Sequence, residues 1–320
     1  MKEDQITILI PVFNGGTTLR DVFDSLEKQN NKKIIKEIII INDGSSDASH
    51  DIILDYKKKS SYSIMIIKNE KSTGLAINYN RGIQISKTDY IILMHQDIVL
   101  EDMDSFAKIF QPFQNSNVAA AYPALLHPYK VWTAYNFWQK CLFSRFVSKR
   151  HTRFTGKFDC VKKIKDLKFN SSLYRTAGED LDYEMRCSKY GKVVLADLDV
   201  VHLHNKDNNF SLKQLIKKES QLAECYGVNL RRYFLKTKIK DIILLIFRPM
   251  ILLGLFINIF FINRLALLIL LLFCFYYTKL AYLKCYKDFK IIILPFINFI
   301  CLICYSFYFI KGFIYAKQKI

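Results

Sequence analysis

Acidic and amide side chains follow several apolar runs of the chain and could do chemistry together. Asn14, Asp43 and Asp97 each come after such a run, and Glu179 and Asp180 stand where a helical pattern begins. Carboxylates are usual protein ligands of Mg²⁺ and Mn²⁺, and these ions neutralise phosphate oxygens. A carboxylate in the first turn of a helix is favoured in its ionised form, which can act as a general base. The residue types therefore suit metal-assisted chemistry that also removes a proton.

The elements that must position these side chains alternate between strand and helix patterns. Strands are predicted at residues 6–10, 37–41, 64–67 and 90–94, with a helix at about 73–85. One amphipathic helical face is formed by Leu19, Val22, Phe23 and Leu26. This alternation predicts an α/β fold with a mostly parallel sheet, in which ligands bind beyond the carboxyl ends of the strands. We therefore expect Asn14, Asp43 and Asp97 to meet at one edge of the sheet.

The amino-acid composition limits the cell compartment and the binding partners that we predict for this protein. The 320 residues carry a net charge of +18, and the apolar residues concentrate after Asp241. No aromatic-interleaved RNA motif is present, so we predict no nucleic-acid partner; anionic lipid and phosphorylated substrates are the remaining partners of such charge. The polar residues 1–5 lead directly into a strand pattern, and the eight cysteines form no disulfide framework. Both observations predict a catalytic domain on the cytoplasmic side.

The C-terminal third predicts membrane attachment. Residues 211–240 form a basic amphipathic helix pattern, which we expect at the membrane surface. Apolar runs follow at 242–262, 265–283 and 291–310. The last run is long enough to span a bilayer, whereas Arg248-Pro249 interrupts the first, which could cross or lie in the interface. Basic residues flank every run, so orientation is not fixed, and we expect two or three crossings, as a multi-pass or hairpin anchor.

The middle of the chain, residues 130–175, is rich in lysine and arginine. One interpretation is a solvated loop surface. The other is a surface that meets lipid headgroups or a phosphorylated acceptor. The sequence leaves both open.

A series of short motifs resembles the family 2 glycosyltransferases, which have a GT-A fold. The resemblance covers roughly residues 5–210, and the motifs stand in the family's order and spacing. The matching segments are Ile8–Asn14, Glu37–Asp47, Asn69, Gly74–Ala76, Asn80–Gly82, Asp89–Ile91, Gly178–Arg186 and Val201–His202. The resemblance implies transfer of a sugar from a nucleotide-sugar donor.

The resemblance also implies roles for individual residues on the donor side. Asp43 matches the acidic residue that contacts the base or ribose, and the alternative for an Asp-Gly-Ser, an Asx turn or helix cap, fits Asp47 better. Pro11 and Asn14 would shape the same wall. The residues assigned to the nucleotide sugar are Pro11, Asn14, Asp43, Asn80, His95 and Gln96.

The metal and the base are implied in the same way. Asp97 matches the family's metal-binding aspartate and His202 its metal-binding histidine, with His204 as the alternative ligand, for Mn²⁺ or Mg²⁺. Asp180 matches the general base, and Glu179 would orient the acceptor or the base. Asp182 and Arg186, four residues apart on a helix, are expected to form an ion pair.

One departure from the family pattern concerns the metal site. The usual Asp-x-Asp is here His95-Gln96-Asp97, so a histidine stands in the place of the first aspartate. The first aspartate usually touches ribose or metal-bound water, which a histidine could also do. This departure is the only support for a different class of protein, a non-catalytic nucleotide-binding membrane scaffold.

We therefore predict three parts: a GT-A-like domain over 1–210, an interfacial helix over 211–240 and a membrane region over 241–320 with two or three transmembrane helices. The predicted function is transfer of a sugar from a nucleotide-diphosphate sugar to a lipid-linked or glycan acceptor, with inversion, in the synthesis of cell-surface polysaccharide or glycolipid.

The alternative enzyme is a polyprenyl-phosphate glycosyltransferase, in which Lys157 to Lys168 would hold the acceptor phosphate. A processive polysaccharide synthase is disfavoured because no Gln-x-x-Arg-Trp segment is present. The oligomeric state stays open.

Overall fold

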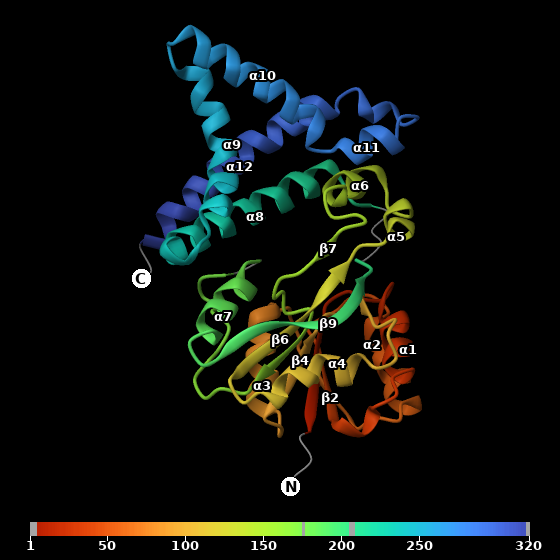
Figure 1. The fold of residues 1–320 in the computed structure, drawn as a ribbon. Helices are drawn as coiled ribbons and strands as arrows, with labels where there is room; N and C mark the ends of the chain where they lie inside the picture. Colours follow the sequence, from red (N-terminus) through yellow and green to blue (C-terminus); the bar gives the residue numbers. More distant parts are fainter. Residues whose placement is uncertain (1–4, 175–176, 205–208, 318–320) are drawn as a thin grey trace. The chain divides into compact units, whose positions relative to one another are not determined.

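The computed structural model describes residues 5–174, 177–204 and 209–317 (Figure 1). The chain divides into two compact units, one of residues 1–129 with 148–206 and the other of residues 130–147 with 207–320. Residues 130–147 thus cluster with the C-terminal helices, although they lie within the range that the sequence assigned to the catalytic domain. Arg175, the end of the basic stretch, lies outside the described residues.

The first unit is built on a single mixed sheet of nine strands with the order β3-β2-β1-β4-β8-β6-β9-β5, in which β7 pairs with β6. Strands β1 to β4 are parallel to one another, β8 is antiparallel to both β4 and β6, and β9 is parallel to β6. The strands are β1 Ile6–Val12, β2 Ile35–Asn42, β3 Ile64–Lys68, β4 Tyr90–Met94, β5 Ile98–Val99, β6 Val118–Leu126, β7 Arg150–His151, β8 Phe158–Lys162 and β9 Lys192–His202. The expected α/β fold is confirmed. The sheet, predicted to be mostly parallel, is mixed, because β8 pairs antiparallel with β4 and β6, and β5 and β7 pair antiparallel with β9 and β6.

Helices cover both faces of this sheet. They are α1 Leu19–Glu27, α2 Ser49–Lys59, α3 Leu75–Ile85, α4 Ser105–Phe110 and α7 Glu179–Cys187, with short 3₁₀ turns at Lys32–Ile34 and Gln111–Gln114. Successive side chains of a strand point to opposite faces. Accordingly Ile8 packs with the face covered by α1, α2 and α4, whereas Leu9 packs with α3 and α7.

Most of the elements expected from the sequence are present within a few residues of their predicted bounds. The fourth strand spans Tyr90–Met94, and the predicted face of the first helix, Leu19, Val22, Phe23 and Leu26, is buried. Pro11 lies in the central strand β1, where the register with β4 ends at Leu9. Proline has no backbone N–H to donate. Because Pro11 lies beyond the last residue that pairs with β4, the sheet loses no hydrogen bond there.

The second unit is helical. Its elements are α5 Tyr129–Thr133, α6 Phe137–Phe143, α8 Leu212–Tyr233, α9 Ile239–Phe256, α10 Phe260–Tyr276, α11 Lys279–Lys284 and α12 Leu294–Lys317, with 3₁₀ turns at Phe234–Lys236 and Phe289–Ile291. Of the helices in the described ranges, α12 is the one whose length and composition suit a membrane crossing, over Leu294–Tyr315, and the apolar α10 is shorter. The expected two or three crossings stay a prediction.

Helices α8 and α12 pack side by side with their backbones in close approach. A Cβ atom on Gly227 of α8 would lie 2.0 Å from the carbonyl oxygen of Phe309, and one on Gly312 of α12 would lie 2.0 Å from the carbonyl oxygen of Glu224. Because backbone atoms oppose both positions, no rotamer change can make room.

We therefore expect Gly227→Ala and Gly312→Ala each to lower the free energy of unfolding by about 1–3 kcal/mol or more, since the helices must move apart. Thermal unfolding of the detergent-purified chain measures this. Ile314→Ala, at an exposed position of the same helix, is the control and should change stability by less. Unchanged stability of both glycine variants would contradict this packing.

Candidate functional site

The loops that follow β1, β2 and β4 meet at the carboxyl edge of the parallel strands. The side-chain oxygen of Asn14 accepts a hydrogen bond from the backbone N–H of Ser46 (2.9 Å), and the Asn14 N–H donates to Oγ of Ser45 (3.0 Å). Gln96 binds Phe13 twice, accepting from its N–H (2.7 Å) and donating to its carbonyl (2.9 Å). The predicted convergence of Asn14, Asp43 and Asp97 on one edge is thus realised through direct bonds between their loops.

Asp43 is buried at the end of β2, and its carboxylate organises the loop before α3. It accepts hydrogen bonds from Asn69 (2.8 Å), Ser72 (2.8 Å), the N–H and hydroxyl of Thr73 (2.8 and 3.0 Å) and the N–H of Gly74 (2.9 Å). Burial by itself raises the pKa of Asp43, but these hydrogen bonds outweigh it and hold the pKa below its ordinary value. Asp43 therefore carries a full negative charge at the predicted nucleotide-binding surface.

Asn80 lies in α3 and binds a backbone segment through both ends of its amide. Its Nδ2 donates to the carbonyl of Phe169 (2.9 Å), and its Oδ1 accepts from the Phe169 N–H (2.7 Å). In this arrangement the amide positions the segment before α7. Its assignment to donor binding stays a prediction.

Asp97 and His202 come together from separate strands. Residues Ile98 and His202 are paired in the antiparallel β5–β9 ladder, and Nε2 of His202 lies 3.1 Å from Oδ2 of Asp97. The other carboxylate oxygen, Oδ1 of Asp97, and Nδ1 of His202 are both buried without a hydrogen-bond partner, as is Nε2 of His95. A buried hydrogen-bond acceptor without a partner destabilises the fold. A bound cation would satisfy these acceptors, because their lone pairs can serve as its ligands.

A third and a fourth imidazole extend this cluster. Ligand atoms of His127, His202 and His204 all lie within 4.8 Å of one another. His127 follows β6, and its Nδ1 is 3.3 Å from Nε2 of His204. Sequence reasoning missed His127; the signal available was a histidine placed directly after a strand end, as with His202.

These imidazoles are held neutral. Burial lowers the pKa of His95 to about 3 and that of His127 to about 4. Burial also holds the pKa of His202 and of His204 well below the ordinary value. Neutral imidazole nitrogens keep a lone pair, which is the form that binds a metal ion.

Glu179 and Asp180 form an acidic cluster at the start of α7, the second cluster of the site after that of Asp97 and the histidines. The N–H of Leu181 donates to Oδ1 of Asp180 (2.8 Å), and Oε2 of Glu179 is buried without a partner. Burial raises the pKa of Asp180, and burial followed by the charge of Asp180 raises the pKa of Glu179. A carboxylate with a raised pKa is a stronger base. Asp182 accepts from Nε of Arg186 (2.9 Å), which confirms the expected ion pair.

Tyr79 and Asp159, which the sequence did not single out, lie near both clusters. Tyr79 is fully buried, and its pKa is raised by burial and then by the charges of Asp97, Asp159, Glu179 and Asp180. Its hydroxyl donates to the carbonyl of Gly156 (2.6 Å), and the loop N–H groups of Thr155 and Gly156 donate to the buried Asp159. Burial raises the pKa of Asp159 to about 7.

Lys157 extends from this same loop, and its charge lowers the pKa of Asp159, Glu179 and Asp180. Its carbonyl accepts from the His95 N–H (3.0 Å). It is therefore the cation shared by the acidic cluster and the histidine cluster.

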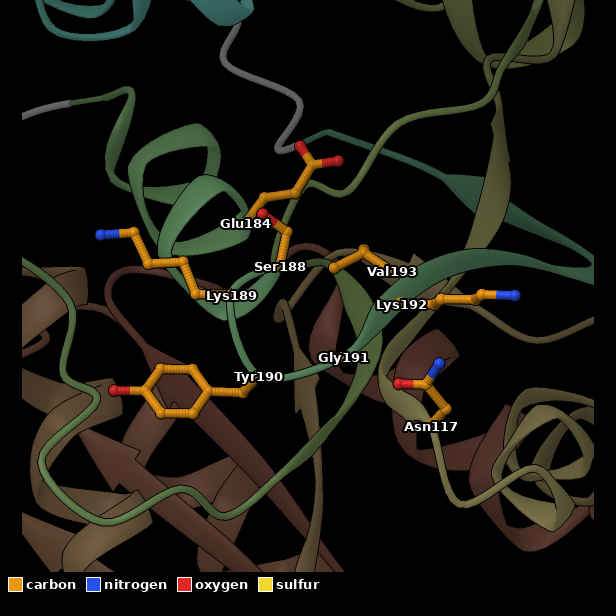
Figure 2. A pocket seen from close by; sticks show the side chains of 8 residues that line it. All are labelled: Asn117, Glu184, Ser188, Lys189, Tyr190, Gly191, Lys192 and Val193. Atoms are coloured by element: carbon orange, nitrogen blue, oxygen red, sulfur yellow. The ribbon is translucent and has the colours of Figure 1, made fainter.

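A pocket of about 560 Å³ lies elsewhere in this unit, at the end of α7 and the start of β9. Figure 2 shows that the polar ends of Glu184, Lys189 and Lys192 diverge there instead of converging on one point. A ligand site needs convergent polar groups. The pocket also contains none of the residues of the two clusters, so we do not assign the reaction to it.

The fold resembles that of known glycosyltransferase structures. The mannosyltransferase PcManGT of Pyrobaculum calidifontis, solved with GDP-Man and Mn²⁺, is similar over 99% of this chain and 89% of its own, with a TM-score of 0.60 at 11% identity. At that identity the likeness shows the fold, a GT-A-like sheet flanked by helices.

The family follows from the sequence. Residues 7–172 match the model of glycosyl transferase family 2, and the chain belongs to that family. Poly(ribitol-phosphate) beta-glucosyltransferase of Bacillus spizizenii is 37% identical over 93 residues, which is 29% of this chain and 15% of that protein. Poly-beta-1,6-N-acetyl-D-glucosamine synthase of Staphylococcus epidermidis is 32% identical over 115 residues, or 36% of this chain and 27% of that protein. The chain thus spans less than a third of either relative.

Proposed function

We propose that this protein transfers a sugar from a nucleotide-diphosphate sugar to a lipid-linked glycan acceptor at a membrane, with inversion, in the synthesis of cell-surface polysaccharide or glycolipid. The observation that carries the proposal is the pairing of Asp97 with His202 at 3.1 Å on the rim of a family 2 fold. The carboxylate pair Glu179–Asp180 on α7 supplies the candidate base.

The donor set fits a divalent cation. Unpartnered buried acceptors on Asp97 and His202, with His127 and His204 beside them, are the groups that would hold it. When bound, such an ion supplies positive charge to the leaving diphosphate.

The chain's own residues then perform the transfer. Asp180 accepts the proton of the acceptor hydroxyl as its oxygen forms a bond to the anomeric carbon, and the bond from that carbon to the diphosphate oxygen breaks. Lys157 adds positive charge near both clusters. Asp43 holds the loop 69–74 at the nucleoside wall.

The ligand set also implies a metal preference. Mg²⁺ favours oxygen ligands, whereas imidazole suits first-row transition metals. We therefore expect Mn²⁺ to bind this chain more tightly than Mg²⁺, and His127→Ala to weaken Mn²⁺ binding by at least about tenfold. Calorimetry with the metal alone measures both. His50→Ala is the control, since His50 lies at the start of α2 and contacts Asn42. Equal affinity for the two ions and no effect of His127→Ala would exclude His127 from the site.

The pH profile tests Asp180 as the base. A base must be ionised, so activity is present above its pKa and is lost as pH falls through it. Burial raises that pKa and the charge of Lys157 lowers it. The charge of Asp180 in turn raises the pKa of its neighbours Glu179, Glu184 and Asp159. Replacing Lys157 with glutamine removes the opposing charge, and the acid limb of kcat/KM should move to higher pH. Lys162→Gln, in the same β8 region but bonded to Ser116, should leave the limb in place. An unmoved limb in Lys157→Gln would remove Lys157 from this role.

Membrane attachment is the second half of the proposal. Helices α9 and α10 expose many large apolar side chains, more than soluble proteins leave to water. The exposed residues include Ile243, Leu244, Phe247, Met250, Leu253, Phe260, Phe261, Leu265, Leu268, Leu271, Leu272 and Phe275. We propose that residues 241–320 enter the membrane and that α8 lies at its surface. The chain should stay with the membrane pellet after an alkaline carbonate wash, and its release would contradict this half.

One observation favours the rival acceptor, a polyprenyl phosphate. Lys157 lies among the acidic residues, where it could meet an acceptor phosphate. However, Lys163 donates to the carbonyl of Ser86 (2.6 Å) and Lys162 to that of Ser116 (3.3 Å), so these two point to backbone. A phosphate acceptor needs little base catalysis.

The deciding experiment measures nucleotide release by the detergent-purified chain from a panel of nucleotide-sugars, with Mn²⁺, Mg²⁺ or chelator, and with membrane lipid extract as the acceptor source. Metal-dependent release from one donor, lost in Asp97→Ala and Asp180→Asn, supports the proposal. Release that survives Asp180→Asn favours the phosphate acceptor. Nucleotide binding without any release supports the non-catalytic scaffold instead.

A further inference from the structure

The helical unit contains a charged cavity that the transfer reaction does not use. Its volume is about 180 Å³, and α8, α9, α12 and the segment that follows α6 border it. The polar groups at its wall belong to Arg145, Glu219, Tyr226, Arg248 and Tyr305. Two guanidinium groups therefore face one carboxylate in a space lined by aromatic rings.

The single carboxylate is already committed to one of the two arginines. Oε1 of Glu219 accepts from Nη2 of Arg145 (2.5 Å), and Oε2 of Glu219 accepts from the hydroxyl of Tyr277 (2.6 Å). Arg145 also donates to the Tyr277 hydroxyl, and its Nε is buried without a partner. Both oxygens of Glu219 are thus in use, and its charge balances Arg145.

Arg248 has no such counter-ion among the residues that the structure describes. Its guanidinium lies over the rings of Tyr305 (4.1 Å) and Tyr277 (4.9 Å). Aromatic faces stabilise a cation only partly, by about 0.5–2 kcal/mol, and they leave its hydrogen-bond donors unused. A partly buried arginine in this setting has the geometry to bind a phosphate oxygen pair.

The position of Tyr305 is supported by the backbone next to Arg248. Pro249 has no N–H, so the carbonyl of Leu245, one turn earlier, lacks its helical donor. The hydroxyl of Tyr305 donates to that carbonyl (3.2 Å). The ring of Tyr305 is thereby fixed beneath the guanidinium of Arg248.

The side chains around the cavity point to the class of ligand. Leu222 and Tyr226 of α8 line it, and the same helix exposes Lys213, Lys217 and Lys218. Such lysines keep α8 out of the hydrocarbon and at the level of the headgroups. Helix α9, which carries Arg248, also exposes Leu244 and Phe247. The cavity itself combines the positive charge of Arg248 with the apolar side chains of Phe146 and Leu222.

We propose that this cavity binds the phosphate headgroup of an anionic membrane phospholipid, with Arg248 as the residue that contacts the phosphate. The net charge of the cavity, one positive unit from two arginines and one glutamate, matches one such group. This inference does not depend on sugar transfer, because binding is expected without any nucleotide sugar.

The test measures binding to the full chain in a neutral detergent, with no donor present, by native mass spectrometry and by the shift of the unfolding temperature. The probes are phosphatidic acid, phosphatidylcholine, farnesyl phosphate and inorganic phosphate. We expect phosphatidic acid to bind tightest and to stabilise the chain. Arg248→Gln should weaken its binding about tenfold or more, whereas Arg264→Gln, at an exposed position of α10, should not.

Each other outcome decides against part of the proposal. Equal binding of phosphatidic acid and phosphatidylcholine to the unaltered chain overturns it, and this comparison stands even if Arg248→Gln fails to fold. An affinity unchanged in a folded Arg248→Gln also overturns it. Farnesyl phosphate bound far more tightly than phosphatidic acid would support a phosphate on an apolar tail but overturn the phospholipid source. Inorganic phosphate bound equally well would overturn the membrane source altogether.

Discussion

Replacing Asp180 with asparagine is expected to lower kcat for sugar transfer by about 10²- to 10⁴-fold, the range for loss of a general base. The physical reason is specific to the carboxylate. Asparagine has the same shape and can still accept the hydrogen bond from the Leu181 N–H, but it cannot accept the acceptor's proton. The structure should therefore stay intact while the chemistry fails.

The measurement is kcat and KM for the donor identified by the nucleotide-release panel. Donor affinity by calorimetry should be unchanged, because Asp180 is not predicted to touch the nucleotide. Lys189→Gln is the matched control: this exposed residue follows α7 and lines the outer pocket, so its loss should lower kcat by less than about tenfold. Full kcat in Asp180→Asn, with a hydroxyl acceptor, would show that another group takes the proton.

The second large effect is expected at the metal cluster. Asp97→Ala should weaken Mn²⁺ binding by more than about 100-fold, beyond the 10- to 100-fold typical of losing a group that only supports a ligand. Asp97 contributes the carboxylate oxygens that lie beside His202, and its removal leaves imidazoles alone. Sugar transfer should fall by at least about 10²-fold, since charge on the leaving diphosphate would no longer be neutralised.

Calorimetry with Mn²⁺ alone separates this effect from any loss of activity. Asp199→Ala is the control, because Asp199 lies on the same β9 strand and forms an exposed ion pair with Arg150. Such pairs contribute about 0–1 kcal/mol, so neither metal binding nor transfer should change. If Asp97→Ala bound Mn²⁺ as tightly as the unaltered chain, the cluster would have to be reassigned to a structural role.

The local elements could be predicted from the sequence because their signals are local. The apolar runs at 37–41 and 90–94 lie in strands β2 and β4, and the predicted face of Leu19, Val22, Phe23 and Leu26 is the buried side of α1. Parallel order among β1 to β4 followed from the alternation of strands and helices. The family motifs carried the rest of the fold expectation.

The antiparallel half of the sheet could not be predicted in this way. Strand β8 inserts between β4 and β6, and the two-residue β5 pairs with the end of β9. These pairings join residues far apart in the chain, such as Tyr90 with Lys162 and Ile98 with His202, and no local pattern encodes such a partner. The same applies to residues 130–147, which cluster with the C-terminal helices.

By itself the sequence determined the family, the α/β class, the order of the motifs and the apolar C-terminal third, because each of these is written in composition, periodicity or short spacing. Only the tertiary structure decided that His127 and His204 join His202 beside Asp97, that Asp43 holds the loop before α3, and that Lys157 lies between the two clusters. It also decided that Arg145 and Arg248 share one cavity. The physical reason is that charge and metal affinity depend on distances between side chains, and the fold brings together residues that the chain holds far apart.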